Sequence, residues 1–490
     1  MSGKTIPLHP VGTPGRGADL GRWPLLGRFL HWKHARTAVQ IPMLLIAALI
    51  LFDGWYGPSL APRNIAGVLP WVHWRGFVVL ALLIAGNLFC MACPFMLPRR
   101  LAKRLFPADR AWPAWIPGKW LAIVLLLVFF WAYEVFDLWA SPWLTAWVAA
   151  AYFLGAFVID GFFRGAAFCK HVCPIGQFNF VNSLVSPTEI RVRDHDICAS
   201  CKTKDCIRGH HESETGKLIQ SGCELWLFQE RKVGNLDCTY CLDCVQACPY
   251  DNVSMIARNP IREFSVDPNR SGIGRLSRRT DIAALALILV FGAFVNAFGM
   301  VSPVFRFQRW LADMLRLESE AVVLLLIFGT GLLLLPALLV GYAGIVSRWL
   351  AEQRDAELLP LINRFVIALV PLGMAMWTAH YGFHFFTGAL TIIPVMQEFL
   401  GDFGVGFAGE PRWDLAGILP VTLIDWFELL ILEAGLLITL WAIYRTSSSI
   451  YPKPAAIRGA IPWGIIAVLL LAAGIWLMSQ PMEMRGTILG

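Results

Sequence analysis

Long apolar runs alternate with short polar segments along most of the chain, and one long polar stretch lies near its middle. An apolar run of about 20 residues is long enough to cross a bilayer as an α-helix. The pattern predicts about nine such spans, at 37–55, 76–97, 119–139, 143–163, 281–303, 321–346, 362–386, 415–443 and 461–479. The predicted fold class is therefore an all-α polytopic membrane protein with a polar insertion after its fourth span.

These spans divide the chain into four parts. Residues 1–36 are polar and basic, and we expect them to form a cytoplasmic tail that ends at the membrane surface. A membrane half of four helices follows over 37–184, and the polar insertion occupies 185–275. A second membrane half of about five helices covers 276–490.

Basic residues predict which loops face the cytoplasm, because Lys and Arg gather on that side of a membrane protein. The tail carries six of them, and the segment after the second span reads Pro98-Arg-Arg-Leu-Ala-Lys-Arg104. The stretch between the first two spans has only Arg63 and Arg75. We therefore expect the amino end and the insertion to lie in the cytoplasm, with the protein in the inner membrane of a bacterium.

Composition supports the membrane assignment. Of the 490 residues, 57% are hydrophobic and only 15% are charged, with 21 Trp and 32 Phe. A soluble protein of this size needs a larger polar share to cover its surface. The net charge of +7 does not indicate nucleic-acid binding, because Lys and Arg lie mostly between apolar spans, where the positive-inside bias accounts for them.

The insertion holds eight of the twelve cysteines. Its second half, Cys238-Thr-Tyr-Cys241-Leu-Asp-Cys244-Val-Gln-Ala-Cys248-Pro249, has the C-x2-C-x2-C-x3-C-P spacing of bacterial ferredoxins. In that spacing three thiolates bind one [4Fe–4S] cluster, and the fourth binds a neighbouring cluster. A zinc site also uses paired C-x2-C motifs, but four cysteines this close, closed by Cys-Pro, favour a cluster.

The first half of the insertion is less regular. Cys198 and Cys201 are two residues apart, but four residues precede Cys206, and Cys223 follows only after sixteen more. The crossed pattern of two-cluster ferredoxins predicts two [4Fe–4S] clusters. Their predicted ligands are Cys198, Cys201, Cys206 and Cys248 for one cluster and Cys238, Cys241, Cys244 and Cys223 for the other. The bunched cysteines also favour a reducing compartment over a disulfide framework.

The other four cysteines lie at predicted helix ends. They form the pairs Cys90-Met-Ala-Cys93-Pro94 and Cys169-Lys-His171-Val-Cys173-Pro174, which the predicted topology puts on the same side as the insertion. Three interpretations remain open for them: a third [4Fe–4S] cluster, a redox-active disulfide, or small residues buried at helix ends. The equal depth of the two pairs favours the cluster.

The cysteine motifs resemble those of membrane polyferredoxins of the NosR/NapH type, and within that group a FesM-like branch. The residues that carry the resemblance are Gly86–Phe95, Phe168–Phe178 and Cys238–Pro249, within about 36–255. The resemblance implies electron transfer between the quinone pool and a respiratory partner, such as a cytochrome c or a dehydrogenase subunit. The chain departs from the pattern, because it has no large flavin-binding domain before its first span and has a second membrane half.

Two histidines of the seventh predicted span are candidate ligands. His380 and His384 are four residues apart and share one helix face. They could bind a metal, haem b or a quinone head group, or they could be interfacial histidines that bond to their neighbours. One face of one helix cannot supply both axial ligands of a haem, so a haem would need a ligand such as His73 opposite them.

Acidic residues at membrane depth are further candidates, because a charge in hydrocarbon is costly and is usually functional. Asp425, Glu428 and Glu433 lie in the eighth predicted span, and Glu134 and Asp137 lie at the end of the third. For Asp425 and Glu428 we favour a role in handling protons with a quinone. Glu134 and Asp137 fit a polar helix cap equally well. His210 and His211 are expected to face solvent.

Together these features predict a membrane iron–sulfur protein that transfers electrons between a quinone and a redox partner, as one component of a quinol-linked oxidoreductase. The alternative is an accessory protein without turnover, such as a redox sensor or a maturation factor for a respiratory metalloenzyme. A sensor needs an output module, and none is recognisable in the sequence.

Overall fold

The computed structural model describes residues 17–106, 110–405 and 409–482. Within these residues, eight helices are long and apolar enough to cross a membrane, which confirms the all-α polytopic class. Their bounds are Ala35–Tyr56, Ile65–Ala85, Pro142–Phe162, Thr280–Phe298, Glu320–Leu350, Leu358–Gly388, Val421–Ile450 and Lys453–Met478. The remaining predicted span, 119–139, forms the shorter apolar helix Trp120–Val135.

The first membrane half is built from short and long helices in alternation. Its elements, with the segment before it, are η1 (Leu20–Arg22), α1 (Pro24–His31), α2 (Ala35–Tyr56), η2 (Ala61–Arg63), α3 (Ile65–Val68), η3 (Leu69–Trp74), α4 (Arg75–Ala85), α5 (Leu88–Ala92), α6 (Met96–Leu105), α7 (Trp120–Val135), α8 (Pro142–Phe162), α9 (Ala167–His171), α10 (Pro174–Asn182) and η4 (Ser183–Val185).

The second span begins about ten residues earlier than the sequence predicts, because η3 continues into α4 through polar side chains that all have partners. His73 Nε2 lies 2.9 Å from the Ala389 carbonyl, and the Arg75 guanidinium lies against the rings of Trp71, Tyr133 and Tyr381. Because His73 and Arg75 are polar, hydropathy alone predicts that the span starts after them, at 76.

The same span ends at Gly86, so the Cys90 pair lies outside it in α5. Gly86 has φ +74°, a left-handed conformation that glycine adopts without strain. A Cβ there would lie 2.6 Å from both Ser186 Oγ and Tyr240 Oη. The turn at Gly86 therefore carries the chain from the membrane to the cysteine-rich insertion.

The insertion is a small domain of short helices and two antiparallel strand pairs. Thr188 to Val192 of β1 pair with Ala257 to Val253 of β4, and β2 pairs with β3. Its elements are β1 (Thr188–Val192), α11 (His195–Ser200), α12 (Asp205–Arg208), β2 (His210–His211), β3 (Leu218–Gln220), η5 (Gln229–Arg231), α13 (Asp243–Gln246), β4 (Val253–Ala257), η6 (Pro260–Ser265) and η7 (Leu276–Arg278).

The segment before the first span packs on this domain. The predicted tail covers residues 1–36, and its first part, 1–16, lies outside the described residues. Asp19 forms a bridge to Ile256 of β4 and accepts a 2.7 Å bond from Arg193 Nε. Leu30 of α1 is 1% exposed in a core that also contains Val245. Part of the predicted tail is thus a wall of the cysteine-rich domain.

The second membrane half packs around two central helices. Most of α14 and α19 is buried. Helix α14 contacts η7, α10 and α22, and α19 contacts α4, α10, α21 and α22. Its elements are α14 (Thr280–Phe298), α15 (Ser302–Leu315), α16 (Glu320–Gly329), η8 (Thr330–Leu334), α17 (Leu335–Leu350), α18 (Leu358–Ala368), α19 (Val370–Gly388), α20 (Ile392–Asp402), α21 (Val421–Ile450) and α22 (Lys453–Met478).

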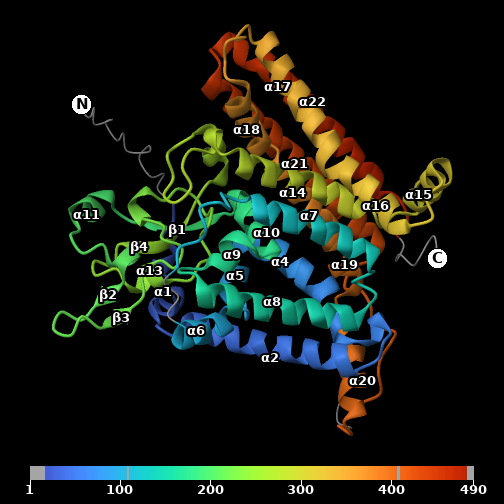
Figure 1. Cartoon of the computed structure of the whole chain (residues 1–490), viewed down its shortest axis with the longest axis horizontal. Helices are drawn as coiled ribbons and strands as arrows, with labels where there is room; N and C mark the ends of the chain where they lie inside the picture. Colours follow the sequence, from blue (N-terminus) through green and yellow to red (C-terminus); the bar gives the residue numbers. More distant parts are fainter. Residues whose placement is uncertain (1–16, 107–109, 406–408, 483–490) are drawn as a thin grey trace.

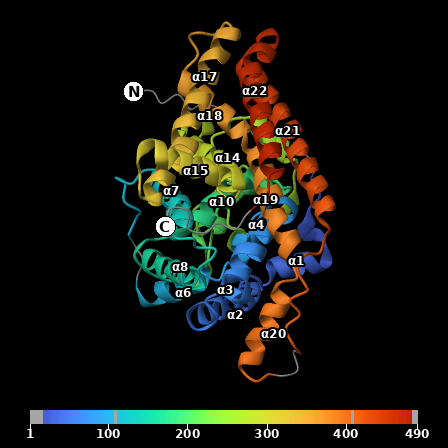
Figure 2. The same ribbon diagram turned by 90° about the vertical axis from the view of Figure 1, so that its right-hand side faces the viewer.

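The arrangement places the cysteine-rich domain at one end of the first membrane half. Figure 1 shows this domain, in green, beside the ends of α2 and α8, which run side by side, while α20 lies at their opposite end. Figure 2 shows α17 and α22 extending from the body on the side away from α20. The cysteines of α5, α9 and the insertion therefore gather in one region.

We predict that this region faces the cytoplasm. Reporter fusions that truncate the chain at Lys103 and at Pro260 should behave as cytoplasmic, because basic residues dominate both neighbourhoods. A fusion at Leu60 should behave as periplasmic. The measurement is the paired activity of a phosphatase reporter and a fluorescent reporter at each position. A periplasmic signal at Lys103 would contradict the predicted orientation.

Candidate functional site

The first group of cysteines, which we call the outer site, draws on both halves of the insertion. Burial, together with repulsion from the Cys198, Cys248 and Cys201 thiols, raises the pKa of the Cys206 thiol to about 11. Asn252 donates from its side chain to Cys198 Sγ and from its backbone to Cys248 Sγ, both at 3.3 Å. The structure therefore brings together the four cysteines that the crossed pattern predicts.

The second group, the inner site, consists of Cys223, Cys238, Cys241 and Cys244, all of which are buried. Burial and repulsion from Cys238 raise the pKa of Cys223 to about 12. Tyr240 and Leu242 have φ of +55° and +67°, left-handed turns that bend the Cys238–Cys244 loop back on itself. Cys223, which sixteen residues separate from Cys206 in the sequence, lies beside Cys238, Cys241 and Cys244.

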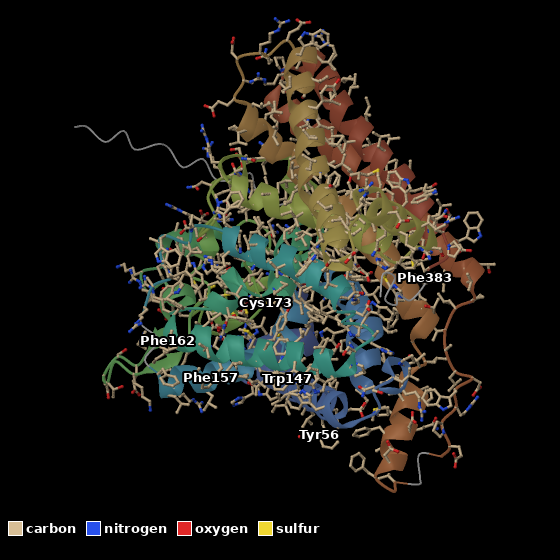
Figure 3. All side chains as sticks on the ribbon, turned by 45° about the vertical axis from the view of Figure 1, so that its right-hand side comes forward. Tyr56, Trp147, Phe157, Phe162, Cys173 and Phe383 are labelled. Carbon is tan, nitrogen blue, oxygen red and sulfur yellow. The ribbon has the colours of Figure 1, made fainter. Side chains whose placement is uncertain are left out.

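The third group, the membrane site, consists of the two Cys-Pro pairs, Cys90 with Cys93 and Cys169 with Cys173. Burial raises the pKa of Cys93 to about 11 and that of Cys173 to about 12, and repulsion from Cys93 is the second cause for Cys173. Figure 3 shows Cys173 within the molecule, whereas Tyr56 and Trp147 lie along its edge. All twelve cysteines are free thiols in the structure, and no disulfide joins these pairs.

The three sites follow one another from the membrane half outward. Cys90 of the membrane site lies close enough to Cys238 of the inner site for their thiolates to repel, and Asn87 Nδ2 donates to the Cys238 carbonyl at 2.5 Å. Cys244 of the inner site is likewise close to Cys206 of the outer site. The order is membrane site, inner site, outer site.

The donor sets fit iron–sulfur clusters. Each site offers four sulfur atoms, and four buried thiolates repel one another unless metal ions supply positive charge. Backbone N–H groups also point at sulfur, from Leu227 to Cys223 at 3.4 Å and from Gly176 to Cys173 at 3.3 Å. Hydrogen bonds of this kind are one way in which proteins tune the potential of a cluster.

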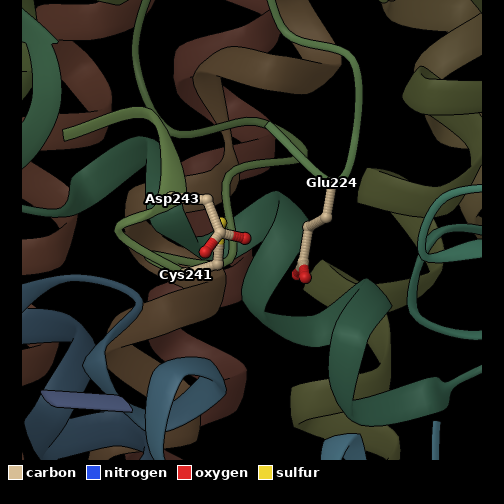
Figure 4. A group of neighbouring side chains, drawn as sticks. All are labelled: Glu224, Cys241 and Asp243. Atoms are coloured by element: carbon tan, nitrogen blue, oxygen red, sulfur yellow. The ribbon is translucent and has the colours of Figure 1, made fainter. Parts of the chain in front are cut away.

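A different metal site could be suspected at the inner cysteines. Oxygen atoms of Glu224 and Asp243 lie within 4.8 Å of each other and of Cys241 Sγ. Figure 4 shows these three side chains. The Glu224 carboxylate is already bonded to Arg36 Nη1 at 3.0 Å, to Arg99 and to Thr239 Oγ1 at 2.8 Å. We interpret this group as an ion-pair centre beside the cysteines and not as a metal site.

We call Glu224, Arg36 and Arg99 the Glu224 hub, and this group joins three parts of the chain. Arg36 lies at the start of the first span. Arg99 belongs to α6 and also lies 3.8 Å from Asp160 of α8. The side chains of Arg36, Arg99 and Glu224 are 4%, 5% and 7% exposed. Burial alone would raise the pKa of Glu224, but the two guanidiniums hold it far below its usual range, so the carboxylate stays charged.

A second charged group lies beside the first. Lys119 Nζ donates to Asp237 Oδ1 at 3.0 Å and to the Lys170 carbonyl at 2.9 Å. Asp237 and Lys170 also line a polar cavity of about 360 Å³. His171 stacks on Trp112 at 4.4 Å, and burial together with Lys119 and Lys170 lowers its pKa to about 4. His171 is therefore neutral at physiological pH.

A second cavity, apolar and about 290 Å³ in volume, begins at the membrane site and extends between the two membrane halves. Cys90, Cys93, Cys169 and Cys173 line one end. Residues of α4, α7 and α19 line the remainder, among them Arg75, Phe130, Trp377 and Tyr381. The sequence pattern predicts Arg75 in a loop and does not predict this cavity. The feature that could have indicated the cavity is a single arginine among aromatic residues.

The candidate histidines lie apart from the cysteines. The Nε2 atoms of His380 and His384 are 3.1 Å apart, and His380 is fully buried. His73 directs its Nε2 at the Ala389 carbonyl. Among the described residues no hydrogen bond joins His73 to His380 or His384, and haem b stays a prediction from the sequence. His210 bonds to Asp205 at 2.9 Å, and His211 is exposed.

The candidate carboxylates differ in burial. Glu428 is 4% exposed, and among the described residues its Oε1 atom has no hydrogen-bond partner. Asp425 and Glu433 are exposed on the surface of α21, Glu134 is buried, and Asp137 is half-buried. None of these five residues lines the cavity at the cysteines within the described part of the chain.

Two curated proteins are similar to part of the chain. "Putative electron transport protein YccM" of Escherichia coli (strain K12) is 25% identical over 274 residues, which are 51% of this chain and 64% of that protein. "Uncharacterized protein MJ0749" of Methanocaldococcus jannaschii is 25% identical over 190 residues, 37% of this chain and 68% of that protein. The chain thus matches less than two thirds of the first relative. No family model and no solved structure matches.

We predict that the Glu224 hub stabilises the inner site. Glu224→Gln removes the counter-charge of the buried Arg36 and leaves Arg99 with Asp160 alone, at 3.8 Å. Breaking a buried pair in this way costs roughly 3 to 5 kcal/mol. The melting temperature of the purified protein should fall, together with the iron bound per chain. The matched control is Glu357→Gln, which removes an ion pair to Arg278 whose side chains are 69% and 65% exposed. Equal melting temperatures for the two variants would contradict the role of the hub.

Proposed function

We propose that this chain is a membrane electron-transfer protein that links the quinone pool to a redox partner through [4Fe–4S] clusters. The similarity to a protein named for electron transport supports the general class. The observation that carries the proposal is the succession of three four-cysteine sites from the membrane half to the surface of the insertion.

The proposed ligands follow the three groups. One cluster would be held by Cys198, Cys201, Cys206 and Cys248, a second by Cys223, Cys238, Cys241 and Cys244, and a third by Cys90, Cys93, Cys169 and Cys173. When bound, such clusters accept and donate single electrons. The chain's own residues set their surroundings: Asn252, Leu227 and Gly176 direct N–H groups at sulfur atoms of the three sites.

The outer site is the proposed contact with the redox partner. Cys198, Cys201 and Cys248 are only half-buried, whereas every cysteine of the inner site is buried. Ile197, Leu218 and Tyr250, near the outer site in sequence, expose 38%, 49% and 55% of their surface. A soluble partner could therefore approach the outer cysteines more closely than any others in the domain.

The membrane half is the proposed contact with quinone. A ferredoxin domain needs no membrane spans of its own, yet here it is inserted between two membrane halves. A quinone dissolves in the bilayer and would reach the membrane site from within it. The alternative, a maturation factor or redox accessory, requires the same clusters but no exchange of electrons with quinone.

We predict about eight to twelve iron atoms per chain, with equal acid-labile sulfide, because each cluster contains four of each. Cys241→Ser should remove close to one cluster's iron. A double change, Cys90→Ser with Cys173→Ser, should remove the iron of another. The measurement is iron and sulfide analysis of purified protein with a paramagnetic resonance spectrum. Unchanged iron in the double variant would leave the membrane cysteines as packing residues.

We also predict that a short-chain quinol reduces the clusters of the purified protein, or that the matching quinone reoxidises them. The loss of visible absorbance on reduction measures this directly. Cys173→Ser should slow the reaction strongly, whereas Glu433→Gln, a change on the exposed face of α21, should not. If neither quinol nor quinone reacts with the wild-type clusters, the accessory function replaces the proposal.

A further inference from the structure

We propose that the quinone ring binds in the apolar cavity beside the membrane site, with Arg75 as the residue that holds its carbonyl oxygen. This assignment rests on the proposed function and adds to it the location of the ring and the residue that binds it. The lining of the cavity includes both the four membrane cysteines and Arg75.

Arg75 is the polar group best placed to hold a ligand here. Its guanidinium lies 4.6 Å from the ring of Trp71, 4.9 Å from that of Tyr133 and 5.1 Å from that of Tyr381. Ring faces attract a guanidinium through its flat surface and leave the N–H groups in its plane able to donate. Tyr133 accepts one hydrogen bond from this guanidinium and Glu134 lies near it, and the remaining N–H groups can donate to an acceptor in the cavity. A quinone carbonyl is such an acceptor on an otherwise apolar ring.

Packing between the two membrane halves fixes this arrangement. Gly76 of α4 meets α19 so closely that a Cβ on it would lie 2.7 Å from the Phe385 ring. This contact sets Arg75 beside Tyr381 of α19. Trp377, one turn earlier, donates to the Leu289 carbonyl at 2.9 Å and lies 4.9 Å from the Tyr381 ring. The wall at this end of the cavity is therefore rigid and aromatic.

The remaining rings make the wall of the cavity aromatic. Phe130 is parallel to Trp377 within 11° at 6.2 Å, and Phe178 meets Trp377 edge-on at 5.5 Å. The cavity volume of about 290 Å³ includes the end at the four cysteines. The part between Arg75 and the aromatic residues is the proposed place of the quinone ring, with the isoprenoid tail left to the bilayer.

This cavity is a better site than the histidine pair. His380 and His384 bond to each other at 3.1 Å and do not line the cavity in the described structure. The cavity, by contrast, ends directly at Cys90 and Cys173. A ring bound there needs no further carrier between it and the cysteines, which removes the need for haem.

The proposed reaction at this site is the two-electron oxidation of a quinol or its reverse. Oxidation of a quinol breaks its two O–H bonds and yields the quinone, two protons and two electrons. The electrons pass one at a time to the acceptor at the cysteine end and then to a one-electron redox protein, while the protons go to water. Reduction of a quinone is the same reaction in reverse and takes its electrons from that redox protein.

Binding tests the site independently of turnover. The full chain in nanodiscs, purified without quinone, is titrated with decylubiquinone and separately with a short-chain naphthoquinone, and tryptophan fluorescence is followed. Arg75→Gln should weaken binding roughly ten- to one-hundredfold, because it removes a hydrogen bond to a charged donor. Tyr381→Phe, a milder change, should weaken it a few-fold. Iron content should stay at the wild-type level in both variants.

The matched control is Arg445→Gln. Arg445 also lies over a tryptophan, with its guanidinium 5.4 Å from the Trp441 ring, but it is exposed and outside the cavity. Its substitution should leave the affinity unchanged. An azido-substituted short-chain ubiquinone should label peptides that contain residues 71–78 or 371–386, as mass spectrometry can show.

Three results would overturn the site. They are equal affinity in the wild type and Arg75→Gln, loss of affinity in His380→Ala alone, and labelling confined to α21. If wild-type clusters react with quinol while Arg75→Gln behaves as wild type, the proposed function stands and the site is wrong. If quinone binds through Arg75 but never exchanges electrons with the clusters, the site stands and the proposed function is wrong.

Discussion

The buried ion pairs of Glu224 with Arg36 and Arg99 are the contact on which the arrangement of the cysteines depends. Glu224 directly follows Cys223, and its carboxylate accepts a bond from Thr239, which follows Cys238. Arg36 begins the first span, and Arg99 lies one turn beyond the Cys93 pair. Three charges withdrawn from water are stable only together. One carboxylate thereby holds the inner cysteines against the membrane cysteines.

The sequence indicates which cysteines of the insertion lie together, because local spacing and the crossed ferredoxin pattern suggest the two groups. It also predicts the number of apolar helices, since length and hydropathy suffice for that. It does not place the start of the second span, because His73 and Arg75 count as polar until their tertiary partners are known. Nor does it show that Leu30 is buried in the insertion, because a short polar segment gains order only from that contact.

The second membrane half is harder to interpret from sequence for the same reason. Its candidate polar residues, His380 and Glu428, are conspicuous along the chain but lie away from the cysteines. Its useful contribution comes from Trp377 and Tyr381, which look like ordinary core residues in the sequence. They become part of a site only because Gly76 allows α19 to approach α4. The two halves thus build together what neither builds alone.

The interleaving of the insertion's cysteines has a consequence for how the protein is made. Cys248 joins the group begun by Cys198, whereas Cys223, which lies between them in the chain, joins the group begun by Cys238. A ribosome must therefore release the chain through Cys244 before the inner set of four thiols can converge, and through Cys248 before the outer set can. The membrane pairs converge only after the translocon has placed the second and fourth spans in the membrane. Convergence of the three cysteine groups thus requires both the translation of the insertion and the membrane insertion of the spans before it.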